Sequence, residues 1–392
     1  MIQAEVRHPS TLSDADASDW RRLCAAEPGF SSPLLGPDFA RLVGEVREDA
    51  RVAVLRQDGR TAGFLPFHKR PNGFARPIGS AFSDYHALIA ATDAPIDGPE
   101  ALAAAHIGAF AFTGLIDPLG AFPRARPSGM SGHVIALQGT AEAHQESLKA
   151  ANPKRYKNWR RLQNKLEREF GELQITPLDR DQEAFDLLLA WKRDQFRRTG
   201  SHDVLRAGWA RALFQTAFER RDGPLRGVMT TLRAGGRLVA GHFGLAGDQA
   251  CHVWISAMDP ACAGCGPGQV LMMQAPETLE ALGLKVYDLG PGYAHYKAPF
   301  ATGEVAIAEG LTMADGPSGL AARSLDSAWS LAGDGRINVV CRLRRRLDHI
   351  AAAELSVSGR VRGVIEALAG SSRRAASREP VRPEPALEQA EG

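Results

Sequence analysis

Alternating hydrophobic and polar positions predict three successive strands in the second half of the 392-residue chain. They cover residues 227–232, 238–245 and 251–257, and short glycine-containing turns separate them. Strands joined by such short turns run antiparallel, so the segment predicts a meander. The sequence GCGPG follows at 264–268, where its glycines free the backbone just before the next element.

A helix is predicted after this glycine loop, because four apolar residues recur at i, i+4, i+8 and i+11 and form one buried stripe. These residues are Leu271, Ala275, Leu279 and Leu282. Pro267 suits the first helical turn, Pro276 is expected to kink the helix, and Gly283 is expected to end it. A further strand over 284–289 and a glycine turn at 290–292 complete the segment.

A glycine loop that opens a helix presents backbone N–H groups and the positive end of the helix dipole. Phosphate or pyrophosphate is therefore the ligand that the loop favours. Because the loop lacks the Lys-Ser/Thr of a P-loop and the spacing of the dinucleotide-binding pattern, a tight turn without a ligand is the alternative. Cys262 and Cys265 have no second CxxC or histidine pair to complete a metal site, so we expect packing under the loop and no metal.

The first half of the chain repeats part of this pattern. A strand, two helices and a hairpin are predicted, over residues 1–9, 13–25, 38–46 and 51–68. Ser13 or Asp14 is expected to cap the first helix, and Asp58-Gly59 to form the hairpin turn. Like the later meander, this hairpin has a Gly-Arg turn followed by an apolar strand that contains Ala-Gly. The repetition favours a duplicated fold. Nothing like GCGPG recurs here, so we expect the first copy to shape an acceptor site and not to bind a cofactor.

Residues 152–170 predict a helix with one apolar and one basic face, begun by Asn152 and Pro153. Six basic residues precede its first acid: Lys154, Arg155, Lys157, Arg160, Arg161 and Lys165. A solvated charged face is the simplest interpretation. The functional alternatives are contact with an anionic acceptor such as a lipid-linked saccharide, with the inner-membrane surface, or with tRNA. We expect no DNA partner.

Over about residues 20–315 the sequence resembles the bacterial cellulose and exopolysaccharide acetyltransferase family of the CelD/BcsL type, which is related to the FemAB aminoacyl transferases. The resemblance is carried in the second half by NPKRYKNWRRLQNKLERE, GCGPG and YDLGPGYAHYK. In the first half it is carried by SSPLLGPDFARLV, DGRTAGFLPFHKR and FSDYHALI. The chain is also similar to acyltransferases that modify holdfast polysaccharide.

The resemblance implies an α/β fold of the α+β kind, with tandem GNAT-like domains, each a mixed, mostly antiparallel sheet flanked by helices. We expect a GNAT-like domain over 1–147, an acyl-CoA-binding domain over 148–316, an arginine-rich helical extension over 317–370 and a disordered tail over 371–392. It also implies acetyl-CoA or another acyl-CoA as the cofactor. The residues expected to bind it are Ser256, Gly264, Cys265, Gly266, Gly268 and Gln269.

Acyl transfer from a thioester requires a polarised carbonyl, a deprotonated nucleophile and a protonated leaving thiolate. Asp288, at the end of the last core strand, is the first candidate for the base, and His242 is the second. Asp288 capping the 290–292 turn and His242 packing in the core are the structural alternatives. Tyr296 and Lys297 are candidates to protonate the thiolate or to bind the acceptor. Three residues of the first half are candidates to line an acceptor cleft, or form an ordinary turn: Asp84, Tyr85 and His86.

Basic residues also gather near the C-terminal end of the chain, at Arg342, Arg344, Arg345 and Arg346. Guanidinium groups close together can grip phosphate and stack on a base, so cyclic di-GMP is a candidate regulator, and a solvated or membrane-facing helix is the alternative. No early apolar run indicates a signal peptide or a membrane span, and five cysteines without framework spacing fit reduced thiols. We expect a cytoplasmic protein, with peripheral attachment to the inner membrane as a further expectation.

Three classes of function follow from the sequence. The first is an N- or O-acyltransferase, of the acetyltransferase kind, that uses acyl-CoA to modify a cell-envelope or exopolysaccharide sugar. The second is an aminoacyl transferase that uses charged tRNA, although the chain lacks the long helical hairpin of many FemAB members. The third is a non-catalytic binding protein on a GNAT fold, regulated by a cyclic dinucleotide.

Overall fold

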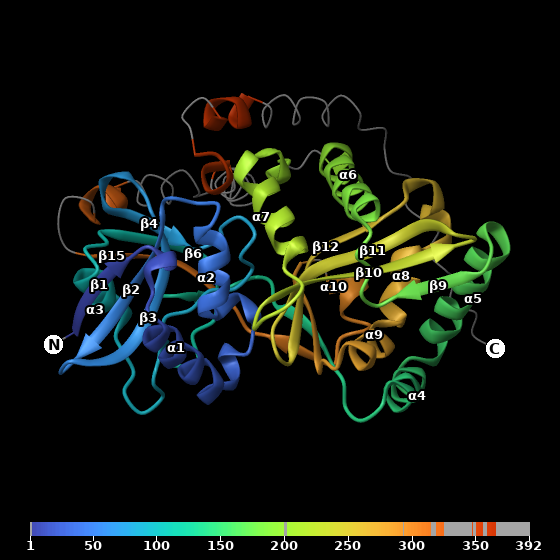
Figure 1. The fold of residues 1–392 in the computed structure, drawn as a ribbon, viewed down its shortest axis with the longest axis horizontal. Coiled ribbons are helices and arrows are strands. Elements are labelled where there is room, and N and C mark those ends of the chain that lie inside the picture. Colours follow the sequence, from blue (N-terminus) through green and yellow to red (C-terminus); the bar gives the residue numbers. More distant parts are fainter. Residues whose placement is uncertain are drawn as a thin grey trace, which may run out of the picture.

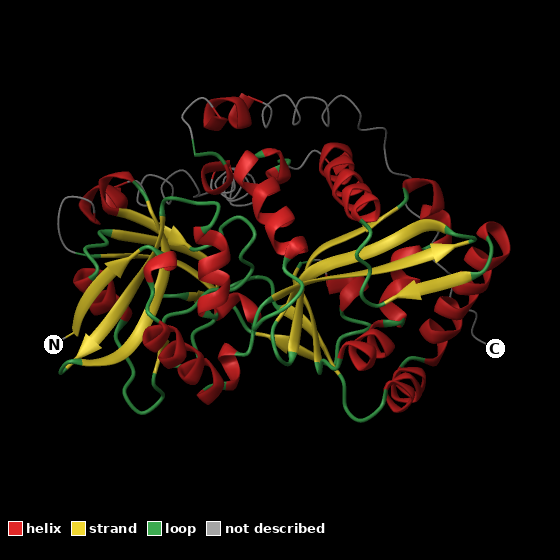
Figure 2. Ribbon diagram, in the orientation of Figure 1, coloured by secondary structure: helices red, strands yellow, loops and turns green. Residues whose placement is uncertain are grey.

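The computed structural model places the strands in two sheets that lie side by side, with helices packed against both (Figures 1 and 2). It describes residues 2–199, 202–292, 294–314, 319–324, 347, 350–355 and 359–365. The expected cyclic dinucleotide arginines, Arg342, Arg344, Arg345 and Arg346, lie outside the described residues. In the part of the chain that is described, no helix is long and apolar enough to cross a membrane.

The first sheet has eight strands. In spatial order they are β1 (Ile2–Arg7), β2 (Ala50–Gln57), β3 (Arg60–Lys69), β4 (Phe74–Pro77), β6 (Ala109–Leu115), β15 (Ala308–Met313) and β7 (Arg126–Pro127), with β5 (Ile89–Ala90) paired to β3. All neighbours are antiparallel except β4 and β6. The helices of this half are α1 (Asp14–Ala26), α2 (Pro37–Gly44) and α3 (Gly98–Ala104).

The second sheet has seven strands. In spatial order they are β14 (Gly303–Val305), β8 (Gly132–Ala136), β13 (Val286–Pro291), β12 (Ala250–Met258), β11 (Arg237–Ala246), β10 (Arg226–Ala234) and β9 (Leu173–Thr176). Figure 1 shows α6 (Gln182–Thr199) and α7 (Gly208–Glu219) over one face. The other face carries α4 (Ala141–Ala151), α5 (Pro153–Phe170), α8 (Pro267–Met273), α9 (Ala275–Leu282) and α10 (Ala294–Lys297).

The two halves exchange strands. β8 comes from before residue 147 but pairs with β13 and β14 of the second sheet, and β15 returns from the end of the second half to pair with β6 and β7. Each sheet therefore contains chain from both sides of the expected boundary at 147/148. Because a strand inside a sheet cannot leave without breaking its ladder of hydrogen bonds, the exchange holds the two halves together.

Three of the local predictions that depend on neighbouring residues are confirmed, and one, the cap at Asn152, is wrong. The Ser13 side chain accepts a hydrogen bond from the Asp16 amide and caps α1. Asp58 and Gly59 both have positive φ, as a two-residue hairpin turn requires. The predicted kink at Pro276 is a break between α8 and α9. Asn152 makes no side-chain cap at the start of α5, because it also ends α4 one residue earlier.

One hydrophobic core runs through the junction of the two halves. It joins Trp20 and Phe64, which stack at 4.8 Å, to Phe214 and Phe243 of the second half. Phe82 reaches across the junction and packs edge-on against Phe214 at 5.1 Å. A continuous buried core fixes the two sheets relative to each other, because separating them would expose large aromatic surfaces.

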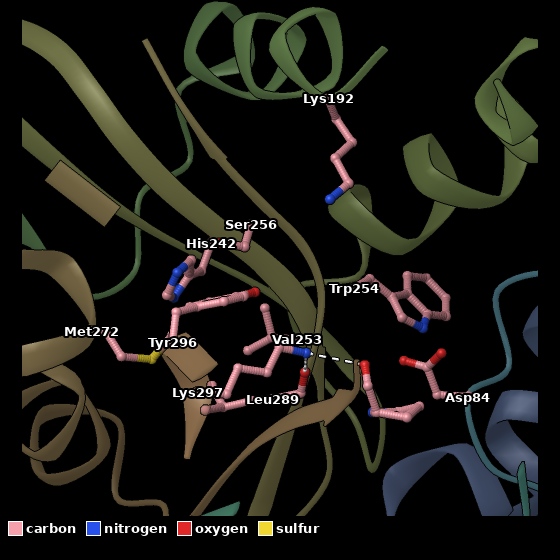
Figure 3. Close-up of a pocket in the computed structure, with 11 residues that line it drawn as sticks. Asp84, Lys192, His242, Val253, Trp254, Ser256, Met272, Leu289, Tyr296 and Lys297 are labelled. Carbon is pink, nitrogen blue, oxygen red and sulfur yellow. Dashed lines mark hydrogen bonds between the residues drawn. The ribbon is translucent and has the colours of Figure 1, made fainter. Parts of the chain in front are cut away.

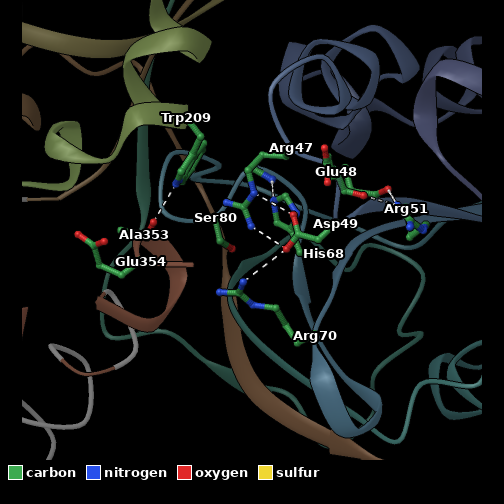
Figure 4. A network of polar contacts seen from close by, with 12 residues as sticks. Arg47, Glu48, Asp49, Arg51, His68, Arg70, Ser80, Trp209, Ala353 and Glu354 are labelled. Carbon is green, nitrogen blue, oxygen red and sulfur yellow. Dashed lines mark hydrogen bonds and ion pairs between the residues drawn. The ribbon is translucent and has the colours of Figure 1, made fainter. Parts of the chain in front are cut away.

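A polar network lies at the same junction, around the carboxylate of Asp49 (Figure 4). Arg47 donates two 2.8 Å hydrogen bonds to Asp49, and His68 and Arg70 contact the same carboxylate. Trp209 of α7 lies 4.4 Å from the Arg47 guanidinium, and its Nε1 donates to the carbonyl of Ala353. The described C-terminal segment 350–355 is thus fastened at the junction of the two halves.

Candidate active site at diverging strands

The parallel strands β12 and β13 pair over only three residues. The last pair is His252 with Asp288. Beyond His252, β12 still pairs with β11 on one edge, but the edge that faced β13 has no strand partner among the described residues. A cavity of about 210 Å³ lies where the strands diverge. Two sides of the cavity are formed by these strands, through Val253, Trp254 and Ser256 of β12 and Leu289 and Pro291 of β13 (Figure 3).

Side chains from five further segments complete the cavity. They are His242 of β11, Lys192 of α6, Met272 of α8, Tyr296 and Lys297 of α10, and Asp84 from the loop that follows β4. Asp84 is the contribution of the first half of the chain. The cavity is therefore composite, and neither half contains it alone.

The structure brings together five of the residues predicted for the site: Asp84, His242, Ser256, Tyr296 and Lys297. Asp288 and Tyr85 are buried one layer behind the cavity and do not line it. His86 is farther away, in the core between Phe110 and Phe112, so its ring does not line the cleft that the sequence suggested. Burial lowers the pKa of His86 to about 3, which makes it a neutral core histidine.

Behind the cavity, His252 connects two carboxylates. Its Nε2 lies 2.9 Å from Oδ2 of Asp84, and its Nδ1 makes an ion-pair contact of 3.2 Å with Oδ2 of Asp288. Oδ1 of Asp288 accepts a 3.0 Å hydrogen bond from the Tyr85 hydroxyl and a 2.8 Å bond from the Gly290 amide. Burial lowers the pKa of His252, but Asp288 and Asp84 outweigh it and raise the value to about 9.

The two lysines of the cavity are in different states. Lys297 donates to three backbone carbonyls, those of Leu289, Gly290 and Pro291, at 2.6–3.3 Å. Lys192 has no hydrogen bond or ion pair with any residue that the structure describes, and its ammonium lies 5.5 Å from the Phe196 ring. Burial lowers the pKa of both lysines, and for Lys192 the nearby Lys297 lowers it further.

His242 and Tyr296 lie next to each other at one end of the cavity (Figure 3). Nδ1 of His242 lies 2.9 Å from the Tyr287 hydroxyl, while its buried Nε2 has no hydrogen-bond partner among the described residues. Burial, Lys297 and Lys192 lower the pKa of His242 to about 4, so the ring is neutral and a weak base at neutral pH. Burial raises the pKa of Tyr296, which keeps its hydroxyl protonated.

The glycine loop lies at the far end of β12, where residues 260–265 form a 3₁₀ helix before α8. Gly266 has φ of +59°, which is the left-handed conformation that glycine favours. Its N–H and that of Gln269 are used in hydrogen bonds within the loop, whereas a Cβ on Gly264 or on Gly268 would meet a single atom, at 3.9 Å. Cys265 is buried under the loop, with its Sγ 3.1 Å from the Glu169 carboxylate.

Helix α5 supports this loop through its apolar face, on which Trp159, Leu162 and Leu166 are buried. Lys165 donates a 3.0 Å hydrogen bond to the Gly264 carbonyl. The opposite face exposes basic side chains, among them Lys154, Arg155 and Arg160. These side chains lie on the helix that carries the loop and do not line the cavity.

Two residues of the site, His252 and Lys192, were not predicted from the sequence. His252 alternates with apolar residues like any strand residue, and Lys192 follows a tryptophan in an ordinary amphipathic helix. His252 is singled out by its contacts with Asp84 and Asp288, and Lys192 by its position in the wall of the cavity. These contacts and the cavity join segments that are distant in the sequence.

The two sheets of mixed, mostly antiparallel strands, with a cavity at diverging parallel strands, define a tandem fold of the GNAT class. Residues 153–298 match the family described as "Acetyltransferase (GNAT) domain". None of the curated proteins compared with the sequence matches it.

Several solved structures are similar to the whole arrangement. A tandem GNAT protein from the clavulanic acid biosynthesis pathway, without AcCoA, is 11% identical, with 81% of this chain and 100% of that chain covered and a TM-score of 0.46. FemX is 11% identical, with 79% and 95% covered and a TM-score of 0.49. A conserved protein of unknown function from Bacteroides thetaiotaomicron VPI-5482 is 14% identical, with 80% and 100% covered and a TM-score of 0.45.

Proposed function

We propose that the protein is an acyl-CoA-dependent acyltransferase that transfers an acetyl or related acyl group to a cell-envelope or exopolysaccharide sugar. The observation that carries the proposal is the cavity between β12 and β13, which the GNAT-matching segment lines together with Asp84 of the first half. The resemblance of the sequence to exopolysaccharide acetyltransferases, including those that modify holdfast, supports a sugar acceptor. The exposed basic face of α5 suits an acceptor that carries phosphate.

The residues present fit an acyl-CoA. Beyond His252, the edge of β12 that faces β13 has no strand partner among the described residues, so its amides are free to bind a carbonyl oxygen. The buried Nε2 of His242 also has no hydrogen-bond partner among the described residues, so it is available to a bound ligand. The backbone at Gly264 and Gly268 is uncrowded, since a Cβ on either would meet a single atom at 3.9 Å, and an anionic phosphate group is favoured beside the start of α8.

An acyl-CoA supplies a thioester, and the residues of the chain act on it and on the acceptor. The β12 amides polarise the carbonyl, which makes the acyl carbon electrophilic. Tyr296, whose hydroxyl stays protonated, is placed to donate a proton to the departing sulfur. Lys297 is already bound to three carbonyls, so its role is to hold the 289–291 turn and not to donate to the ligand.

Calorimetry with acetyl-CoA, combined with release of CoA thiol in the presence of glucosamine, tests the proposal. We expect saturable binding and thiol release that rises with glucosamine concentration. Absence of both overturns the proposal. Transfer from a charged tRNA without any acetyl-CoA binding would instead indicate the aminoacyl transferase. Mass spectrometry of the extracellular polysaccharide, with and without the protein, identifies the acceptor.

A further inference from the structure

The carboxylate of Asp84 lies at the wall of the cavity and is held from behind. Its side chain is 38% exposed, while that of His252, which contacts it, is 0% exposed. Oδ2 of Asp84 contacts Nε2 of His252 at 2.9 Å. Its other oxygen, Oδ1, has no hydrogen bond to any residue that the structure describes. One oxygen is therefore fixed, and the other remains available to a ligand.

Asp288, the first candidate for the base, has no carboxylate oxygen left without a partner. Its Oδ1 accepts from both Tyr85 and Gly290, and its Oδ2 contacts His252. A buried carboxylate with both oxygens engaged cannot take a proton from an acceptor without losing these contacts. His242 lines the cavity but is a weak base, for the reasons given above.

The close packing around Asp84 requires small residues on both sides. A Cβ on Gly290 would lie 2.7 Å from Oδ2 of Asp84, and Gly290 also has positive φ, at +67°. A Cβ on Gly132 would lie 2.0 Å from the Tyr85 hydroxyl. Both glycines leave the space in which a loop of the first half meets β8 and β13 of the second sheet.

We propose that Asp84 is the general base of the acyl transfer and that His252, Asp288 and Tyr85 are residues that position it. The inference rests on the proposed function. Oδ1 of Asp84 accepts the proton of the attacking amine or hydroxyl while His252 holds Oδ2. Asp288 holds the charged imidazole, and Tyr85 with Gly290 holds Asp288. The base is thus supplied to the GNAT domain by the other half of the chain.

Acyl transfer forms one bond at the acyl carbon and breaks another. The nucleophilic nitrogen or oxygen of the acceptor forms a bond to the acyl carbon, and its proton moves to Oδ1 of Asp84. The carbon–sulfur bond breaks, and its electron pair leaves with the sulfur. A proton reaches the sulfur from Tyr296, which regains one from water, and Asp84 returns its proton to water. No oxidant, reductant or further co-reactant is needed.

Asp84→Asn tests the role of the base, because it keeps the shape of the side chain and removes the basic oxygen. Two quantities are measured on the full chain: the Kd of acetyl-CoA by calorimetry, and the rate of CoA thiol release with glucosamine and with water as acceptors. We expect a Kd within about twofold of the unchanged protein and a rate lower by roughly 10²- to 10⁴-fold. Asp93→Asn, an exposed aspartate of the same half, is the matched control and leaves both unchanged.

His252→Gln tests positioning, since a glutamine still donates to Asp84 but carries no charge. We expect the kcat of thiol release to fall by roughly 10- to 10²-fold while the Kd of acetyl-CoA stays within about twofold, because the side chain that holds Oδ2 of Asp84 is altered and the cavity lining is not. The other charged groups that face Asp84, namely Asp288, Lys192 and Lys297, are unchanged in this variant. A purely structural role would weaken acetyl-CoA binding together with the rate.

The outcomes separate the two proposals. If the protein without substitutions neither binds acetyl-CoA nor releases thiol, both the proposed function and the assignment of Asp84 as the base are wrong. If the rate of Asp84→Asn stays within about threefold of the protein without the substitution, Asp84 is not the base, and the proposed function stands. If Asp84→Asn does not fold, as judged by its thermal transition, Asp84→Ser replaces it, because serine is smaller and still accepts from His252.

Discussion

Tyr85 and Asp288 lie 203 positions apart in the chain, yet the Tyr85 hydroxyl donates a buried 3.0 Å hydrogen bond to the Asp288 carboxylate. Burial raises the pKa of Tyr85, and the negative charges of Asp288 and Asp84 raise it further, so the hydroxyl remains a donor. This bond joins the loop after β4 to the last core strand of the GNAT domain. The site therefore depends on how the two halves meet.

Tyr85→Phe should lower the free energy of unfolding by about 1–3 kcal/mol, because the buried Asp288 loses one donor. Urea denaturation measures the change. Tyr156→Phe is the matched control, since this half-buried tyrosine of α5 packs against Trp159 through its ring. We expect the control to change stability by no more than about 0.5 kcal/mol. Equal losses in the two variants would show that the Tyr85 hydroxyl contributes nothing specific.

His252→Gln should destabilise the protein most at low pH. The pKa of His252 is raised from 6.5 to about 9 in the folded state, so its charged form contributes stability that is fully present below pH 6.5. That contribution is lost as the pH rises through 9. The difference in unfolding free energy between the two proteins should therefore shrink between pH 6.5 and pH 9, and a constant or growing difference contradicts a charged His252.

Lys192→Met should raise the melting temperature at pH 7, because it removes a half-buried charge that makes no hydrogen bond or ion pair with the described residues. The pKa of Lys192 is lowered in the folded state from 10.5, so charging the lysine opposes folding at neutral pH. This penalty disappears as the pH approaches 10.5, and the gain in melting temperature should shrink with it. Lys149→Met, at an exposed lysine, is the control and should show no such pH dependence.

Gly266→Ala should weaken acetyl-CoA binding by about tenfold or more if the glycine loop holds the phosphate groups, a change of about 1.4 kcal/mol. Gly283→Ala is the matched control, because Gly283 also has positive φ, at +67° against +59°, and ends α9 in open space. Both variants carry a similar left-handed strain of about 1 kcal/mol. Calorimetry that finds equal affinity in both folded variants rules out this loop.

Reversing two charges on α5, in the double variant Arg155→Glu and Arg160→Glu, should reduce co-sedimentation with vesicles of anionic lipid by roughly 30-fold at low salt. The double variant Arg197→Glu and Arg198→Glu is the control. It changes the net charge equally, at two exposed arginines that pair with Asp194 on α6. Equal losses in both variants would indicate a response to net charge, and no loss in either would indicate a solvated face.

The sequence by itself determined the elements whose causes are local. The β10–β12 meander, the turn at Asp58-Gly59, the break before Pro276 and the left-handed Gly283 follow from alternation, turn residues and backbone restrictions within a few positions. The resemblance between the two hairpins also indicated two similar sheets. Such features are predictable because each depends on the physical properties of adjacent residues.

Only the tertiary structure decided which strands are neighbours and which polar residues meet. An alternating pattern gives a strand one apolar face but does not name its partner, so the exchange of β8 and β15 could not be inferred. For the same reason, sequence reasoning favoured Asp288 as the base, next to its glycine turn. Folding buries Asp288 behind His252 and brings Asp84, from the other half, to the cavity. The burial and the hydrogen bonds of these two carboxylates arise from contacts between residues distant in the chain, which no local pattern reveals.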